Sequence, residues 1–344
     1  MIVFLLLIGA TSYYLFRNNE MGKLLHTMKE ANPIYLVAGM LFMLIFIISE
    51  ALSIQVLMKP LKYMLSFWKC LKYSFVGFYF CSITPSSSGG QPAQVYYMKK
   101  DGVEVSASSL CVMIVTVAYQ IGILLICLFA FVLKRDLIVQ NLGFMKYLVI
   151  FGIVINFGLF AAFVCATFNK TFLEKAFTGC IRLLAMLKIV KDAPKIQEKM
   201  ELQISEYRKG ADYIKNNPRV LFLVLATVII QILSRLSVAY AVYKAFGLHG
   251  YDYADIITLQ AFLALGVEYL PIPGAIGATE TGFLSVNKLI FGSDKLMSAM
   301  LLSRGISFYA FLIISGCVTL GAHLHGGRRH LRDTDANVQN PKST

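Results

Sequence analysis

Long apolar segments dominate this sequence and restrict it to a membrane. The longest cover residues 33–57, 109–133, 220–248 and 297–322. A helix needs about 20 apolar residues to cross a bilayer core of about 30 Å, and each of these segments has that length. Only 15% of the residues are charged, against about a quarter in soluble domains. We therefore exclude a typical soluble enzyme and a disordered chain.

Shorter or weaker apolar segments lie before and between these four, and they raise the number of possible membrane segments. The 344 residues allow about eight membrane segments in all. We predict an all-α polytopic membrane protein. The additional segments are residues 1–16, 71–83, 147–168, 256–270 and 283–291.

The polar stretches divide the chain into two halves of one transmembrane domain, residues 1–322. The halves are about 1–168 and 220–322, and residues 323–344 form a polar tail. The joining segment 169–219 holds eleven Lys or Arg and six Asp or Glu. Its apolar residues recur at helical spacing, which predicts an amphipathic helix on the membrane surface.

The positive charge of the chain predicts its orientation. The net charge is +13, and cytoplasmic loops of membrane proteins collect Lys and Arg. We expect the basic loop 169–219 and the tail on the cytoplasmic side. Segment 248–255 has no Lys or Arg, so we expect it and residues 134–146 outside. We expect no nucleic-acid partner, because no basic stripe carries interleaved aromatic residues.

Each half contains one apolar segment broken by a turn rich in Pro and Gly. The breaks are ITPSSSGGQPAQ at 83–94 and LPIPGAIGATETG at 270–282. Paired interrupted segments in two halves are typical of an inverted repeat with a binding site between them. The alternative is two ordinary loops with turn residues. The residues expected to form the re-entrant turns are Pro85, Gly89, Gly90, Pro271, Pro273, Gly274 and Gly277.

Five charged residues lie inside or beside the apolar segments. A charge at the bilayer centre costs about 2.5–3.5 kcal/mol on insertion scales, so each needs a partner or a polar cavity. We predict a cavity that handles a charged or zwitterionic lipid headgroup, with the arginines on its phosphate and the glutamates balancing them. The alternative is structural ion pairing between helices. The five are Glu50, Arg235, Glu268, Glu280 and Arg304.

Polar residues near the two arginines extend this pattern. Gln231 and Arg235 share a helix face with Ser234 beside them, as do Arg304 and Ser307. Thr116 and Gln120 form a similar pair in the 109–133 segment. We expect no metal and no cofactor, because the chain has no metal-ligand spacing, no phosphate-binding loop and no GxSxG motif.

Three motifs resemble one known family. PIPGAIGATETGF, followed by LLSRGISFYAFLIISG, resembles the lysylphosphatidylglycerol synthase transmembrane family. ITPSSSGGQPAQVYYMKKDGV resembles the matching motif of its first half. That family is the flippase half of the bacterial multiple peptide resistance factor, together with stand-alone relatives. The resemblance covers essentially the whole chain.

The resemblance implies a function in the bacterial plasma membrane. It implies movement of phosphatidylglycerol or aminoacyl-phosphatidylglycerol lipids between leaflets, in connection with resistance to cationic antimicrobial peptides. It also adds Gln91 and Gln94 to the site, where many members carry an acid and a base. The resulting headgroup-binding set is Arg235, Arg304, Glu280, Glu268, Glu50, Gln91 and Gln94.

An alternative stays open beside this function. The chain is then the membrane component of a phosphatidylglycerol lysyltransferase, with a separate soluble synthase as partner. We expect no aminoacyl transfer by this chain alone, because it ends about 22 residues after its last apolar segment.

Overall fold

The computed structural model describes residues 26–168 and 216–324, apart from 142, 144 and 269, together with 210 and 212. The described residues form helices and no strands, which confirms the all-α prediction. The apolar segment 1–16, nearly all of the basic loop 169–219 and the tail from 325 lie outside the described residues.

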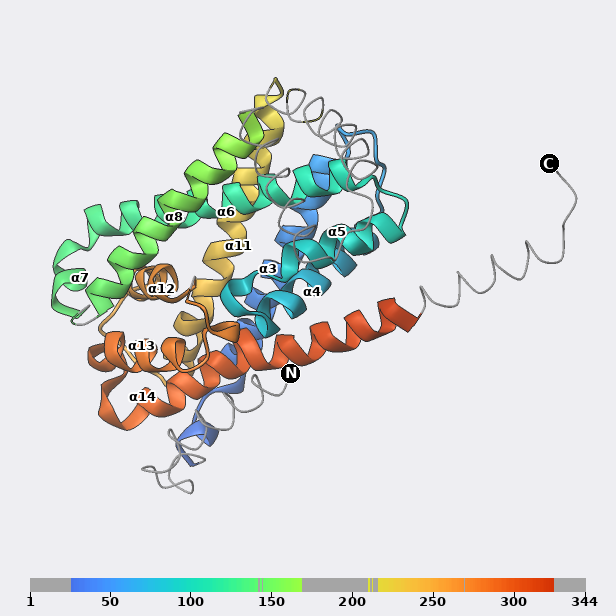
Figure 1. Cartoon of the computed structure of the whole chain (residues 1–344). Helices are drawn as coiled ribbons and strands as arrows, with labels where there is room; N and C mark the ends of the chain where they lie inside the picture. Colours follow the sequence, from blue (N-terminus) through green and yellow to red (C-terminus); the bar gives the residue numbers. More distant parts are fainter. Residues whose placement is uncertain are drawn as a thin grey trace, which may run out of the picture.

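Four helices of the described part are long and apolar enough to cross a membrane. They are Pro33–Met58, Val105–Leu133, Pro218–Ala245 and Lys288–Leu324. The first three are α3, α6 and α11, and α3 packs lengthwise against α11 (Figure 1). Both α3 and α11 begin with proline, which is favourable in the first turn of a helix. Asn32 adds a cap to α3 by accepting a hydrogen bond from Ile34 N.

The two Pro/Gly-rich segments form two broken helices. The first consists of α4 (Phe67–Ile83), the short turn η1 (Pro85–Ser87) and α5 (Gly90–Lys100). The second consists of α12 (Tyr253–Val267), η2 (Pro273–Ala275) and α13 (Ala278–Val286). The turns η1 and η2 lie against each other, although 185 or more residues separate them in the chain.

The two turns have the same backbone pattern. Each starts with proline, and the next two residues have positive φ: Ser86 and Ser87 in η1, and Gly274 and Ala275 in η2. Positive φ is unfavourable for residues with a Cβ, so three of these four positions store backbone strain. Strain of this kind persists only where the surrounding packing holds it.

Two further helices, together with the fourth of the long helices, complete the bundle. They are α7 (Arg135–Asn141), α8 (Met145–Phe168) and α14 (Lys288–Arg304), which continues through the π-turn η3 (Gly305–Ala310). The predicted apolar segment 283–291 is therefore divided between two helices, because α13 ends and α14 begins around Asn287. The predicted segment 297–322 belongs to the same long helix as α14. Asn287 fixes that junction by donating to Phe283 O and accepting from Gln260, each at 3.0 Å.

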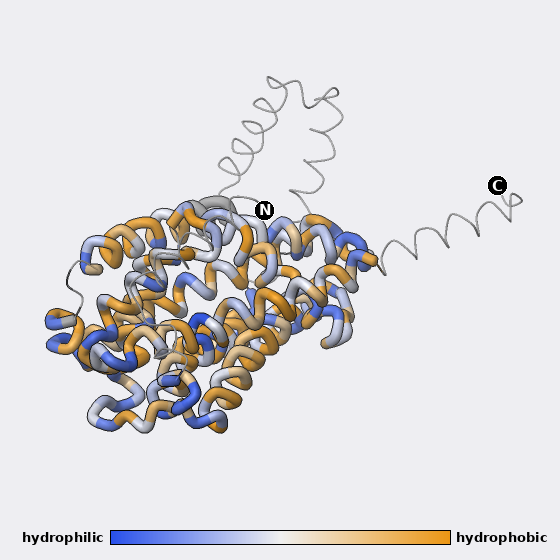
Figure 2. The backbone as a smooth tube through the Cα atoms, turned by 90° about the horizontal axis from the view of Figure 1, so that it is seen from below, coloured by the Kyte–Doolittle hydropathy of each residue, from blue (hydrophilic) through white to orange (hydrophobic). Residues whose placement is uncertain are grey.

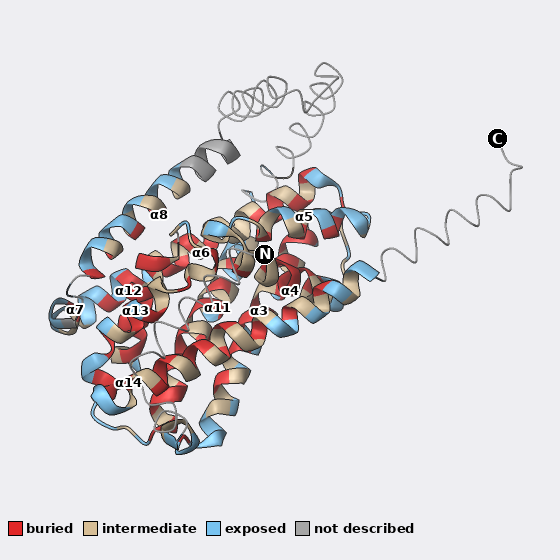
Figure 3. Cartoon of the chain, turned by 60° about the horizontal axis from the view of Figure 1, so that its bottom comes forward, coloured by how far each residue is buried: buried red, intermediate tan, exposed pale blue. Residues whose placement is uncertain are grey.

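Apolar side chains lie on the outside of the bundle as well as inside it. Orange, hydrophobic positions run along the whole helical tube (Figure 2), while the buried positions concentrate where helices meet (Figure 3). Val132 and Phe222 are 71% and 72% exposed. Extended apolar surface of this kind marks contact with membrane lipid, so the structure supports a membrane-embedded protein.

Candidate functional site

A cavity of about 330 Å³ lies at the meeting point of the two broken helices. Its walls come from both halves of the chain. From the first half come α3, α4, η1, α5 and the first part of α6, and from the second come α11, the end of α12, η2, α13 and the α14–η3 junction. A volume of this size falls within the range of small-molecule sites.

Glu50 lies on the first-half wall of the cavity, between two amide side chains. Its Oε1 accepts a hydrogen bond from Gln94 Nε2 at 2.6 Å, and its Oε2 accepts from Gln231 Nε2 at 3.4 Å. Gln94 also donates to Tyr73 O at 3.3 Å. Among the described residues, no basic side chain forms an ion pair with Glu50. The carboxylate is therefore hydrogen-bonded but not neutralised.

Arg235 and Glu268 form a loose ion pair on the second-half wall of the cavity. Arg235 Nη2 lies 3.5 Å from Glu268 Oε2, and both side chains line the cavity. The Arg235 guanidinium also lies 5.9 Å from the centre of the Tyr119 ring, within the range of a cation–π contact. The side chains stay 28% and 19% exposed, so both keep surface toward the cavity.

Arg304 forms a closer and more deeply buried pair with Glu280. Arg304 Nε donates to Glu280 Oε1 at 2.8 Å, and Glu280 is only 2% exposed. The other oxygen of Glu280 accepts from Gly277 N at 2.6 Å and so caps the start of α13. Arg304 Nη2 donates to Gly274 O at 3.1 Å. The pair therefore supports the second turn from two directions, and Glu280 lies behind the cavity wall.

The predicted turn residues meet at the floor of the cavity. Gly90 and Gly274 of the predicted set line the cavity. Ser86, outside that set, lines it too, and its Oγ lies 3.5 Å from Leu270 O, next to Pro271. A Cβ on Gly274 would collide with the Phe308 ring, which explains a glycine there beyond its positive φ of 59°. The remaining predicted turn residues flank these: Pro85 opens η1, Gly89 caps α5, Pro271 precedes η2, Pro273 opens it and Gly277 caps α13.

The structure thus brings the predicted headgroup residues together. Six of the seven line the cavity, and the seventh, Glu280, holds Arg304. Of the predicted polar stripes, Thr116, Gln231 and Ser307 line the cavity, whereas Gln120 and Ser234 are buried outside its lining. The phosphate-binding role of Arg235 and Arg304 stays a prediction.

Two polar atoms in the cavity wall have no hydrogen-bond partner among the described residues. They are Gln231 Oε1 and Ser303 Oγ, on side chains that are 3% and 6% exposed. Buried polar atoms are normally paired, so each is available to a ligand or to water. Ser303 is not among the predicted site residues, because its position in the wall depends on how α14 packs against the rest of the bundle.

A second polar cluster ties the ends of the first broken helix together. Asp101, just after α5, accepts hydrogen bonds from Lys72 Nζ and Tyr73 OH, each at 2.5 Å. Burial alone would raise the pKa of Asp101, but these bonds and the Lys72 charge hold it below its usual value. The Asp101 carboxylate therefore stays ionised near neutral pH, and its two hydrogen bonds fix the α4–α5 hairpin.

Metal binding has no visible basis in the described part of the chain. No group of three or more His, Cys, Asp or Glu side chains is placed there to hold an ion.

The fold and the cavity define a helical membrane protein with a polar, charged site between two broken helices. A family model described as the lysylphosphatidylglycerol synthase TM region matches residues 1–315, and the chain belongs to this family. A UPF0104 membrane protein of Archaeoglobus fulgidus is 32% identical over 104 residues. That match covers 30% of this chain and 32% of the relative.

Proposed function

We propose that this protein moves a phospholipid between the leaflets of the membrane. The substrates proposed are phosphatidylglycerol or its aminoacylated forms, and the membrane is the plasma membrane, with the basic loop and the tail inside. The headgroup enters the cavity while the acyl chains stay in the surrounding lipid. Membership of the lysylphosphatidylglycerol synthase transmembrane family supports this choice of lipid.

The single observation that carries the proposal is the charge arrangement of the cavity. Arg235 and Glu268 face it as a loose, partly exposed pair, while Glu50, on the first-half wall, has only amide partners in the described part of the chain. An anionic phosphate suits the Arg235 side. An amine suits Glu50 and the free Gln231 Oε1. A headgroup with both groups matches both walls.

The proposal includes an inverted repeat of about eight membrane segments, two of them re-entrant. The support is the matched backbone of η1 and η2, which share a leading proline and two consecutive positive φ values. In transporters, broken helices of this kind supply the binding site and the two repeats rock around it. Irregular backbone at membrane depth also needs the cover that a protein-lined cavity gives.

Proteoliposomes that hold only the full chain test the function. Labelled phosphatidylglycerol and lysylphosphatidylglycerol are supplied in one leaflet, and their appearance in the other is measured. Arg235 is a better residue to replace than Arg304, because Arg304 also holds the Gly274 carbonyl. We expect Arg235→Gln to lower the rate for both lipids at least about tenfold, the loss typical of one charged contact. Glu50→Gln should lower the rate for the lysyl lipid more than for phosphatidylglycerol.

Arg135→Gln is the matched control. This substitution makes the same chemical change at the exposed start of α7, outside the cavity lining. It should leave the rates of movement of both lipids unchanged. Absence of lipid movement by the folded wild-type chain would overturn the proposal. So would movement that is equally fast with Arg235→Gln.

A second candidate function rests on the word synthase in the family description. The chain is then the membrane component of a phosphatidylglycerol lysyltransferase, and a separate soluble synthase docks on it. Retention of such a synthase on the purified, immobilised chain, combined with no lipid movement, would favour this candidate over the translocase.

A further inference from the structure

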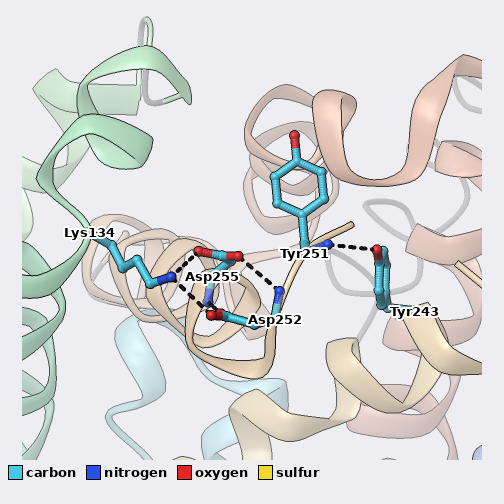
Figure 4. Close-up of polar contacts among 5 residues, drawn as sticks. All are labelled: Lys134, Tyr243, Tyr251, Asp252 and Asp255. Carbon is cyan, nitrogen blue, oxygen red and sulfur yellow. Dashed lines mark hydrogen bonds and ion pairs between the residues drawn. The ribbon is translucent and has the colours of Figure 1, made fainter. Parts of the chain in front are cut away.

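Three ions join the end of α6 to the start of α12. Lys134 Nζ lies 3.0 Å from Asp252 Oδ2 and 2.8 Å from Asp255 Oδ1 (Figure 4). Lys134 follows the last residue of α6 in the first half of the chain, while both acids belong to the second half. We call these three residues the clasp.

Each acid of the clasp uses its two oxygens for two separate purposes. Asp252 Oδ1 accepts from Asp255 N at 2.7 Å, and Asp255 Oδ2 accepts from Asp252 N at 2.9 Å, so the two acids cap α12 reciprocally. The remaining oxygen of each faces Lys134. Capping therefore holds both carboxylates in position before Lys134 arrives, which lowers the entropy cost of the ion pairs.

The acids are also tied to the neighbouring helix. Tyr251 N donates to the hydroxyl of Tyr243 in α11 at 3.2 Å (Figure 4), and the Tyr253 hydroxyl lies 2.7 Å from Ser237 Oγ in α11. The start of α12 is thus anchored on α11, so a movement of α6 away from it would separate the clasp.

Lys134 and Asp252 of the clasp keep their charges at neutral pH. Hydrogen bonds to Asp255 and Asp252 raise the pKa of Lys134. The backbone N–H of Asp255 and the nearby Lys134 lower the pKa of Asp252, against a smaller opposing effect of burial. The two shifts have opposite signs, as expected for a formed ion pair.

The clasp lies at the opposite end of the α6–α12 pair from the cavity. On α6 the cavity lining ends at Tyr119, fifteen residues before Lys134. On α12 the lining begins at Gln260, eight residues after Asp252, and extends to Glu268. At 1.5 Å per residue, the clasp lies roughly 22 Å from the cavity along α6 and roughly 12 Å from it along α12. The two helices are therefore antiparallel and joined at one end, with the cavity between them at the other.

Packed side chains close the space between the cavity and the clasp. On α6, Ile123, Cys127 and Ala130 are buried at spacings of four and three, and Lys134 continues that face. On α12, Ile256 and Leu259 are fully buried. These buried side chains lie between the cavity lining and the clasp along both helices.

We propose that the clasp is a gate: it keeps the cavity closed on its own side of the membrane, and its release opens the cavity to that side. This inference rests on the proposed function, since a gate needs a cavity that opens to both sides in turn. The end where the clasp lies is the side predicted to be external from the absence of Lys and Arg in residues 248–255.

The test measures access to the cavity and does not depend on lipid movement. In a full-length background whose seven cysteines are replaced by Ser or Ala, Thr116→Cys places one thiol in the cavity wall. A membrane-impermeant methanethiosulfonate reagent is added to one side of sealed vesicles at a time. The clasp is weakened with Asp252→Asn and Asp255→Asn together, because asparagine still caps a helix and α12 keeps its start.

We expect labelling from the clasp side to rise at least about fivefold in the double variant, the change that matches a surface ion pair at the upper end of its usual range. Labelling from the other side should not rise. Asp136→Asn is the matched control, since Asp136 is an exposed acid of the neighbouring α7 and lies outside the clasp. Lys134→Gln should reproduce the rise, and Lys134→Arg should not.

Unchanged labelling from the clasp side in both the double variant and Lys134→Gln would overturn the gate. Increased labelling in vesicles whose chain moves no lipid would support the gate and count against the proposed function. Lipid movement with unchanged labelling would support the proposed function and count against the gate. A failure of the gate is therefore distinguishable from a failure of the proposed function.

Discussion

At the scale of single residues, Glu280 combines two interactions that most buried carboxylates do not share. One oxygen neutralises Arg304 at 2.8 Å and the other caps α13 through Gly277 N at 2.6 Å. With 2% of its surface exposed, it has almost no water to replace either partner. Loss of its charge therefore leaves both a buried guanidinium and a helix start without their acceptor.

Glu280→Gln should destabilise the folded protein strongly while keeping its shape. Breaking one side of a buried ion pair costs about 3–5 kcal/mol, because the remaining charge stays buried without compensation. We expect a clear fall in the thermal midpoint, measured as the fraction of protein that stays monodisperse in detergent after heating.

Glu268→Gln is the comparison for that measurement. Its pair with Arg235 is longer, at 3.5 Å, and both side chains are partly exposed. Partly exposed pairs contribute about 0–1 kcal/mol, so the midpoint should fall by a fraction of the Glu280→Gln effect. Equal falls for the two variants would contradict the assignment of Glu280 as the buried support of the second turn.

At the scale of elements, the breaks in the helices follow from short-range signals. Pro85 and Pro273 cannot continue a helix, and Gly274 beside Pro273 tolerates a positive φ, so both breaks are predictable from the sequence. The positive φ values of Ser86, Ser87 and Ala275 are not, because residues with a Cβ adopt them only when the surrounding packing compensates.

Side-chain pairings were less predictable than the elements that carry them. Buried charges such as Glu50 and Arg235 stand out in an apolar segment, so the sequence identifies them as site residues. Their partners depend on how helices pack: Glu50 meets Gln231 across 181 positions of the chain, and Lys134 meets Asp252 across 118. Lys134 and the two acids lie in polar segments, where the sequence marks no charge as special.

The packing of α8 on α12 gives a prediction at this scale. A Cβ on Gly152 would lie far closer to Leu265 O than real contacts allow, whereas one on Gly158 of the same helix meets nothing within 4 Å. Gly152→Ala should force the helices apart and cost about 1–3 kcal/mol. Gly158→Ala should be neutral or stabilising by up to about 1 kcal/mol, because alanine favours the helix.

The same heating assay in detergent checks this pair of variants. Opposite shifts of the thermal midpoint would establish that Gly152→Ala destabilises the protein because the backbones of α8 and α12 lie close together, since the amino-acid change is identical in both variants. A fall with Gly158→Ala as large as with Gly152→Ala would contradict the close packing of α8 on α12.

At the scale of the whole molecule, the cavity and the clasp occupy opposite ends of one helix pair. α6 and α12 enclose the cavity at one end, and Lys134, Asp252 and Asp255 join them at the other. A molecule that exposes its cavity to each side of the membrane in turn must close one side when it opens the other, and the clasp must then form and break in each cycle. The free-energy difference between the two forms has to be a few kcal/mol at most, or only one would be populated.

A covalent replacement of the clasp should therefore hold the molecule in one form. In the cysteine-free background, Lys134→Cys with Asp255→Cys places a thiol on each helix, and a short bifunctional thiol reagent joins them. With a bis-methanethiosulfonate reagent, which joins the two thiols through reducible disulfides, we expect lipid movement in proteoliposomes to stop on cross-linking, because α6 can no longer leave α12. Movement should return when the disulfides are reduced. Asp252→Cys with Asp255→Cys is the control, since both thiols then belong to the start of α12 and the same reagent joins nothing that moves. Movement that continues at full rate after complete cross-linking of α6 to α12 would mean that the two helices stay together throughout the cycle.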